Sequence, residues 1–153
     1  MGTRATDSFY LVGTVVRFLA RNAETGGYCL CEATVAPGAG APPNRHAGED
    51  EAFYVLEGSF DFTIGEDTRR VGPGDFVKIP DGALHAFTNT GDAPGRLLIV
   101  NAPGLVHEQF FSEAGEPLPP GTRDLPASPA PPDIPRLLEA GARAGIAFPR
   151  PGG

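Results

Sequence analysis

Short runs of alternating apolar and polar residues, separated by turns, fill the first two thirds of the chain. Alternation with a period of two is typical of strands that bury one face, and glycine, proline and aspartate mark the turns between such strands. Regularly spaced short strands with no helix among them predict an all-β sandwich or barrel. The strands that we expect are Thr14–Ala20, Tyr28–Ala36, Ala52–Leu56, Ser59–Ile64, Arg69–Val71, Asp75–Ile79, His85–Asn89 and Arg96–Asn101.

Two connections within this pattern carry specific expectations. Pro37–Pro43 is rich in proline and glycine, which do not sustain a hydrogen-bonded ladder, so we predict a loop there. Ala52–Leu56 and Ser59–Ile64 follow each other across a short turn at Glu57-Gly58, so we predict that they pair as a hairpin.

The last part of the chain has a different composition. Eight of the 17 prolines lie between Pro117 and Pro135, so we expect an extended segment that wraps the surface. Pro135–Ala147 follows as a predicted helix, with Asp133 as its N-cap. We therefore divide the chain into a barrel domain, residues 1–116, and a Pro-rich extension with a short C-terminal helix that packs on the barrel, residues 117–153.

The charge and the apolar content of the chain argue against nucleic acid and membranes as partners. The formal net charge is −7 and Lys and Arg are not clustered, which argues against nucleic-acid binding. No apolar stretch is long enough to cross a membrane and the N-terminus does not read as a secretory signal, so we expect a cytoplasmic protein. Cys29 and Cys31 stand two residues apart on one strand and are expected to be buried free thiols.

The candidate chemistry centres on histidine. His46 comes shortly before Glu51 at the head of one predicted strand, and His85 begins another. If the heads of these strands meet, two imidazoles and one carboxylate form a set that suits a divalent metal with open positions for a ligand. His107, the remaining histidine, is expected at the surface or at an interface, and Glu49 is expected to be a solvated neighbour of the ligand loop, as is Asp50.

Two longer patterns surround these candidates. The first runs, in chain order, through Gly38, Asn44, His46, Glu51 and Gly58. The second runs through Gly74, Pro80, Gly82, His85 and Asn89. Their order and spacing resemble the two motifs of the cupin superfamily, over about Thr34 to Asn101, and EDEAFYVLEG resembles single-domain cupins of the quercetin 2,3-dioxygenase-like type.

The resemblance implies a double-stranded β-helix, or jelly-roll barrel, that forms a homodimer. It also implies a divalent transition metal (Fe, Mn, Ni or Zn) at four positions, which in this chain are Asn44, His46, Glu51 and His85. Asn44 stands where the family has a histidine. Three interpretations follow: a looser site with three strong ligands, an Asn44 amide that bonds a substrate or a metal-bound water, or a pocket that works without metal.

Strand alternation also predicts the walls of the site. Residues two apart on a strand share a face, so if Glu51 points inward, Phe53 and Val55 do too. If His85 points inward, Phe87 does too. These residues would form a substrate pocket, although they also suit a plain barrel core. For the strand Tyr28–Ala36 the pattern leaves open which face lines the interior, and Glu32 is expected to face solvent.

Together these features predict a metal-dependent enzyme that acts on a small aromatic or polyketide-like molecule. The resemblance implies quercetin-type dioxygenase chemistry. Glu51 and Asn44 are the candidate catalytic residues, and Glu51 could also act as a base. Isomerase, lyase or decarboxylase chemistry fits the same fold. A small-molecule-binding protein without turnover is the alternative from another class, and the loss of a histidine at Asn44 favours it.

Overall fold

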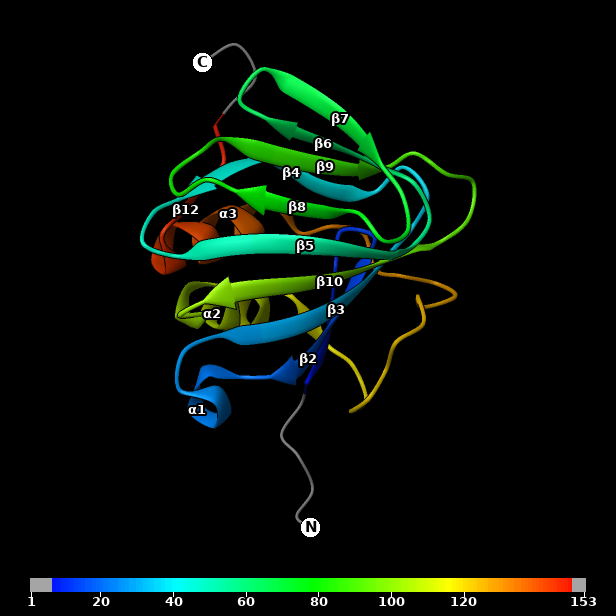
Figure 1. Ribbon diagram of the computed structural model, residues 1–153. Helices are drawn as coiled ribbons and strands as arrows, with labels where there is room; N and C mark the ends of the chain where they lie inside the picture. The colour runs from blue at the N-terminus through cyan, green and yellow to red at the C-terminus, as the bar shows by residue number, and fades with distance from the viewer. Residues whose placement is uncertain (1–6, 150–153) are drawn as a thin grey trace.

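A computed structural model describes residues 7–149 as two antiparallel sheets that face each other across a common core (Figure 1). One sheet has seven strands in the order β11-β1-β2-β3-β10-β5-β8. These strands are β1 (Ser8–Leu11), β2 (Thr14–Ala20), β3 (Cys29–Val35), β5 (Asp50–Glu57), β8 (Phe76–Ile79), β10 (Gly95–Ala102) and β11 (Glu116–Pro117). This arrangement confirms the predicted jelly-roll barrel.

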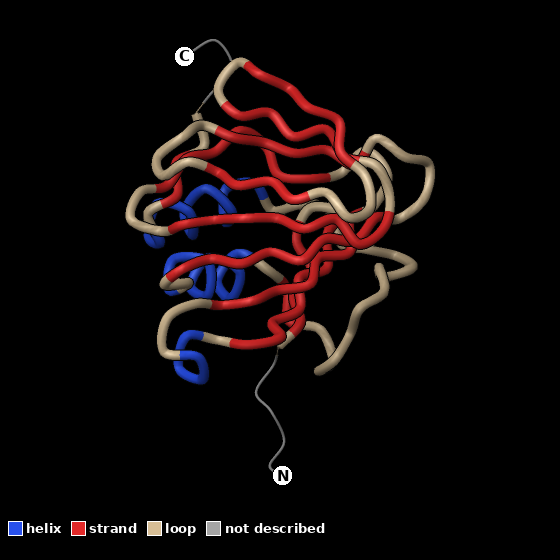
Figure 2. Tube along the Cα trace, viewed as in Figure 1, coloured by secondary structure: helices blue, strands red, loops and turns tan. Residues whose placement is uncertain are grey.

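The other sheet has five strands in the order β12-β4-β9-β6-β7. They are β4 (Gly40–His46), β6 (Phe60–Ile64), β7 (Asp67–Val71), β9 (His85–Asn89) and β12 (Ile146–Ala147). The helices are α1 (Asn22–Thr25), α2 (Leu105–Ala114) and α3 (Ile134–Ala144), and Figure 2 shows them gathered at one end of the strands. Within residues 7–149, none of the helices is both long and apolar enough to span a membrane.

The predicted hairpin between Ala52–Leu56 and Ser59–Ile64 is wrong. β5 pairs with β10 and β8, whereas β6 pairs with β7 and β9 in the opposite sheet. Gly58 redirects the chain between the sheets: its φ is +91°, and a Cβ there would lie 3.0 Å from the Cα of Gly95. A short connection therefore crosses between layers here instead of joining neighbours.

The predicted loop Pro37–Pro43 is wrong over its second half, because β4 begins at Gly40. Pro42 and Pro43 are exposed, and the pairing of β4 with β9 shifts register between Ala41 and Asn44. The prolines thus occupy a bulge, where the missing N–H groups break no regular ladder.

The core fills with phenylalanine. Phe53, Phe60, Phe62 and Phe87 are buried, with ring centroids 4.9–6.4 Å apart. On β3 the inward face is the one that carries Cys29, Cys31 and Ala33, all fully buried, and both thiols are free as expected. Glu32 lies on the other face, where it is largely buried instead of solvated because three arginines surround it: Arg17, Arg96 and Arg123.

The C-terminal part of the chain closes the end of the barrel that carries the helices. Asp133 caps α3 by accepting a hydrogen bond from the Arg136 N–H, as predicted, but the helix ends at Gly145 in a left-handed conformation, before Ala147. α3 packs on α2, a helix that the sequence pattern did not predict, and β12 extends the sheet beside β4. The buried residues of this second cluster are Phe110, Leu137, Ala140 and Ile146.

Candidate metal centre and cavity

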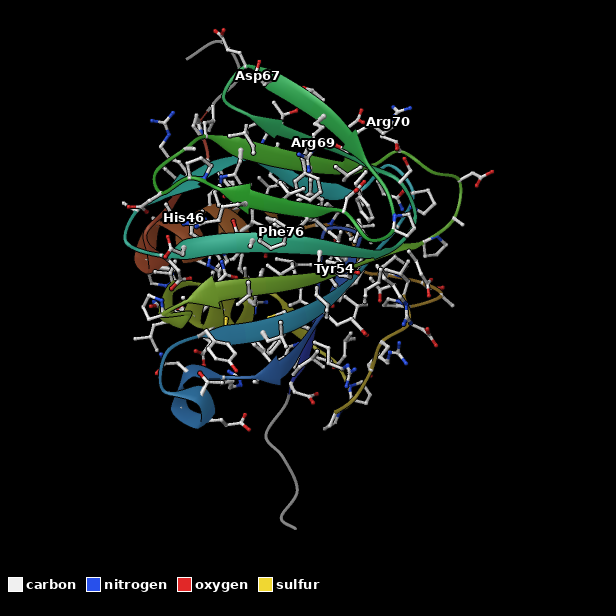
Figure 3. The ribbon with its side chains drawn as sticks, viewed as in Figure 1. His46, Tyr54, Asp67, Arg69, Arg70 and Phe76 are labelled. Carbon is white, nitrogen blue, oxygen red and sulfur yellow. The ribbon has the colours of Figure 1, made fainter. Side chains whose placement is uncertain are left out.

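His46 and Glu51 face each other inside the barrel. His46 ends β4 and Glu51 lies near the start of β5, and the turn between them contains Gly48 with a φ of +79°. Both side chains are buried, and His46 Nε2 lies 3.2 Å from Glu51 Oε1. Figure 3 shows His46 at the end of the barrel where α3 lies.

His85 approaches the same carboxylate from the opposite sheet. It is the first residue of β9, and its Nε2 lies 2.8 Å from Glu51 Oε1, while Nδ1 lies 2.8 Å from the Ala83 carbonyl oxygen. The rings of His46 and His85 are 5.2 Å apart and nearly perpendicular. The structure therefore brings together the two imidazoles and the carboxylate that the sequence singled out.

His107 is the correction to the sequence analysis. It is 95% buried instead of lying at the surface, and its Nε2 lies 3.2 Å from Glu51 Oε2. It comes from α2, and its ring centroid is 4.7 Å from that of His46. The apolar residues Val106, Phe110 and Phe111, at helical spacing around it, are the signal in the sequence that would have placed it on a buried helix face.

Glu49 is also buried, contrary to the expectation of a solvated side chain. Its carboxylate accepts hydrogen bonds from the backbone N–H groups of Gly104, Val106 and His107 at the start of α2, and Oε1 forms a short hydrogen bond with His107 Nδ1. The first N–H groups of a helix lack partners within the helix, and Glu49 supplies one for three of them. Glu49 therefore joins the β4–β5 turn to α2.

Glu51 receives contacts on both oxygens. Besides the three imidazoles, Asn101 donates its Nδ2 hydrogen to Oε2 at 3.0 Å from the neighbouring strand β10. Burial alone would raise the pKa of Glu51, but the charge of His107 and the hydrogen bonds from the histidines hold it well below its usual range. The carboxylate is therefore ionised at neutral pH.

The donor set fits a metal ion. A carboxylate only accepts hydrogen bonds, so each imidazole nitrogen that faces it must carry a proton or share a cation with it. The ligand atoms of His46, Glu51 and His107 lie within 4.8 Å of one another, and His85 Nε2 contacts the same carboxylate. His46 Nδ1 is buried and, within the described part of the chain, has no hydrogen-bond partner. Imidazole and carboxylate together suit Fe, Mn, Ni or Zn.

The metal-free site holds its charge on His107. Burial alone would lower the pKa of His107, but the charges of Glu51 and Glu49 and the hydrogen bonds that the ring donates to both carboxylates raise it to about 10. The pKa of Glu49 shifts in the opposite direction. Burial alone would raise it, but the hydrogen bond and the charge of His107 lower it. Two carboxylates thus enclose one cation in the absence of metal.

Asn44 is buried and its amide nitrogen is already engaged. Nδ2 donates to the carbonyl oxygens of Pro42 at 2.9 Å and His85 at 3.2 Å. The bond to His85 ties β4 to β9 across the bulge, where the two prolines cannot donate, and the bond to Pro42 stays within β4. Only the amide oxygen of Asn44 could therefore contribute to a metal site or contact a bound molecule.

A cavity of about 460 Å³ opens from these side chains into the barrel. Phe53 and Phe87 line it as predicted, whereas Val55 is fully buried in the core and is not part of the wall. Three further phenylalanines come from the C-terminal half: Phe110, Phe111 and Phe148. No Lys or Arg is among the lining residues in the described part of the chain, so the cavity is apolar except where it meets His85, His107, Glu51, Asn44 and two threonines.

Comparisons with known proteins agree with this architecture. The family model described as "Cupin domain" matches residues 31–101. Germin-like protein subfamily T member 3 of Arabidopsis thaliana is 35% identical over 91 residues, 55% of this chain and 39% of that protein. Protein SchB of Streptomyces halstedii is 32% identical over 66 residues, 43% of this chain and 48% of that protein. The chain thus spans about half the length of these curated relatives or less.

Solved structures extend the similarity beyond the matched domain. The polyketide cyclase RemF from Streptomyces resistomycificus is 30% identical, with a TM-score of 0.52 over 67% of this chain and 80% of that chain. KdgF from Halomonas sp. shares the fold, at 22% identity and a TM-score of 0.55 over 60% of this chain and 79% of that chain. With its two motifs, its jelly-roll barrel and these relatives, the chain belongs to the cupin superfamily.

Proposed function

We propose that the protein is a metal-dependent cupin enzyme that acts on a small, uncharged aromatic or polyketide-like molecule. The observation that carries the proposal is the continuity of the site: a cavity walled by phenylalanine ends at one ionised carboxylate, Glu51, that three imidazoles surround. Apolar walls with a few convergent polar groups are typical of a site for a small organic molecule.

His46, Glu51 and His85 would hold the metal through their side chains, as the cupin motifs imply. When bound, a divalent metal supplies a Lewis acid that polarises a substrate oxygen. The low pKa of Glu51 suits it to hold a cation and makes it a weak proton acceptor. This favours the ligand role of Glu51 over the alternative role of a base.

The cavity selects for uncharged substrates. Away from the metal-binding end, the described lining residues include no Lys or Arg to pair with a phosphate or a carboxylate, which favours an uncharged substrate body. Phe53 and Phe87 offer ring faces and edges against which an aromatic substrate packs. Thr88 and Asn44 also line the cavity: the Thr88 hydroxyl could bond a hydroxyl or carbonyl group of that substrate, and the Asn44 amide oxygen could accept from a hydroxyl.

Two reaction types agree with such a substrate. RemF, which is 30% identical, is a polyketide cyclase, and this supports a ring closure or a related lyase or isomerase step without net oxidation. The sequence resemblance supports a quercetin-type dioxygenase reaction, which consumes oxygen. A non-catalytic binding protein is the second candidate, and the replacement of a motif histidine by Asn44 favours it.

The test separates these functions with one preparation. Protein without a histidine tag is analysed for bound metal, loaded with Zn, Fe, Mn or Ni, and incubated with a flavonol or a hydroxylated aromatic polyketide. Oxygen uptake and product mass are then followed. Turnover without oxygen uptake supports the cyclase or isomerase type, and turnover with uptake supports the dioxygenase. Ligand binding by metal-free protein with no turnover under any loading would replace the proposal with the binding function.

A further inference from the structure

We propose that His107 is a ligand of this metal, in place of the imidazole that the first cupin motif lacks at Asn44, and that Glu49 is the residue that positions it. The inference rests on the proposed metal-dependent function and adds a ligand from α2, outside both motifs.

The first support is position. His107 Nε2 lies 3.2 Å from Glu51 Oε2, on the carboxylate that also contacts His46 and His85. Its ligand atom belongs to the group with His46 and Glu51 in which all atoms lie within 4.8 Å, close enough for one ion to contact all three. The ring of His107 is also nearer to that of His46 than the ring of His85 is, with centroids 4.7 Å and 5.2 Å away.

The second support is that Asn44 has another task. Its amide nitrogen bonds two backbone oxygens across the proline-containing bulge, and one of these belongs to His85. Asn44 therefore stabilises the backbone that carries His85. The imidazole that the motif would have at Asn44 is supplied instead by His107 on α2. An amide oxygen is also a weaker partner than an imidazole for a first-row transition metal.

The third support is the contact between Glu49 and His107. Glu49 bonds Nδ1 of the ring, which fixes the tautomer and leaves Nε2 to face Glu51. The same carboxylate accepts three N–H groups from the first turn of α2, so it fixes both the ring and the backbone that carries the ring. Metal-bound histidines usually donate their second N–H to a carboxylate, a backbone carbonyl or a water, and Glu49 is a partner of this kind.

Charge balance points the same way. Glu49 and Glu51 place two negative charges in a buried site, and isolated buried charges are costly. One divalent cation between Glu51 and the imidazoles balances both charges.

The experiment measures Zn²⁺ affinity by competition with a chromophoric chelator, using tag-free, chelator-treated protein. His107→Ala is expected to weaken affinity by about 100-fold or more, and Glu49→Gln by about 10–100-fold, the usual effect of losing such a carboxylate. Gln109→Ala, an exposed change on the same helix, is the matched control and should leave affinity unchanged. Circular dichroism checks that each variant is folded.

A second measurement uses the wild-type protein alone. The chain has three histidines, so ¹⁵N-histidine labelling of the wild-type protein gives three ring systems in long-range ¹H–¹⁵N spectra. We expect Zn²⁺ to shift Nε2 of all three rings, with Nδ1 of His107 still protonated toward Glu49. Two shifted rings and an unchanged third, assigned to His107, would overturn the inference even if His107→Ala does not fold.

The outcomes separate the inference from the proposed function. Wild-type protein that binds Zn²⁺ tightly while His107→Ala binds it equally well refutes the role of His107 and leaves the metal enzyme standing. Wild-type protein that binds no Zn²⁺, Fe²⁺, Mn²⁺ or Ni²⁺ refutes the metal-dependent function, and the inference about His107 with it.

Discussion

The side-chain amide of Asn44 donates to the backbone oxygen of His85 at 3.2 Å, at the point where β4 and β9 pair across the proline bulge. The bond is buried and replaces ladder bonds that Pro42 and Pro43 cannot make. The bond therefore links Asn44, which replaces a histidine of the first cupin motif, to the backbone of His85, the histidine of the second motif.

Asn44→Ala should therefore destabilise the barrel. Two carbonyl oxygens lose their donor, and the bond to the His85 oxygen is buried, so the loss costs about 1–3 kcal/mol in the free energy of unfolding. Urea denaturation of the metal-free protein measures it. Asn22→Ala removes an exposed amide bond to the Pro103 oxygen and serves as the control, with a smaller expected loss of about 1 kcal/mol. Equal losses in the two variants would contradict the structural role of Asn44.

Glu51→Gln should abolish tight metal binding, because it removes the one charged oxygen pair that His46, His85 and His107 all face. It should also destabilise the metal-free protein by about 1–3 kcal/mol, because the buried imidazoles lose a charged acceptor while Glu49 still pairs with His107. Elemental analysis and urea denaturation check the two effects. A variant that keeps stoichiometric metal would refute the assignment of Glu51 as a ligand.

The stability of the metal-free protein should fall at both ends of the pH range. Glu49 and Glu51 have lowered pKa values, so their contribution is present above the unfolded value near 4.5 and is lost as the pH falls through the folded values. His107 has a pKa raised to about 10, so its contribution is full below pH 6.5 and is lost as the pH rises toward 10.

Urea denaturation of chelator-treated protein from pH 3 to pH 10 measures this profile. His107→Gln is the control for the alkaline side, because it has no imidazolium to lose and its stability should change less between pH 7 and pH 10. If the wild type and His107→Gln decline in parallel over that range, the charge on His107 does not stabilise the fold.

Phe87→Leu should weaken the binding of an aromatic ligand several-fold, because Phe87 lines the cavity and an aromatic pair contributes about 0.5–1.5 kcal/mol beyond its buried area. Phe60→Leu is the matched control: Phe60 belongs to the same core cluster but is not among the cavity-lining residues. Fluorescence titration with a flavonol measures affinity. Equal affinities in the two variants would show that the ligand does not occupy this cavity.

We predict a homodimer that forms through the outer face of the seven-stranded sheet. Tyr54 and Phe76 face each other across β5 and β8, are 42% and 58% exposed, and lie together on that face (Figure 3). β8 is also an edge strand, with one side open to pairing. Phe76→Glu should shift the mass in light scattering to that of a monomer, whereas Leu105→Glu, equally exposed on α2, should not. A monomeric wild type would refute the prediction.

The sequence by itself determined most of the strands and three of the candidate ligands. Alternating apolar residues placed most of the strands, and the glycine, histidine and glutamate positions of two motifs identified His46, Glu51 and His85 as neighbours. These features are local or belong to a known pattern, so the chain order alone carries them. Asp133 as the cap of α3 was predicted for the same reason, because its partner lies three residues away.

Only the tertiary structure decided which strands pair and which distant residues meet. Gly58 sends β5 and β6 into opposite sheets, although their closeness in sequence favoured a hairpin. His107 and Glu49, 58 residues apart, form their contact because α2 packs beside the β4–β5 turn, and no local pattern records that packing. Burial of a histidine or a glutamate depends on what the rest of the chain packs over it. The contact between His107 and Glu49 could therefore be found only from the tertiary structure.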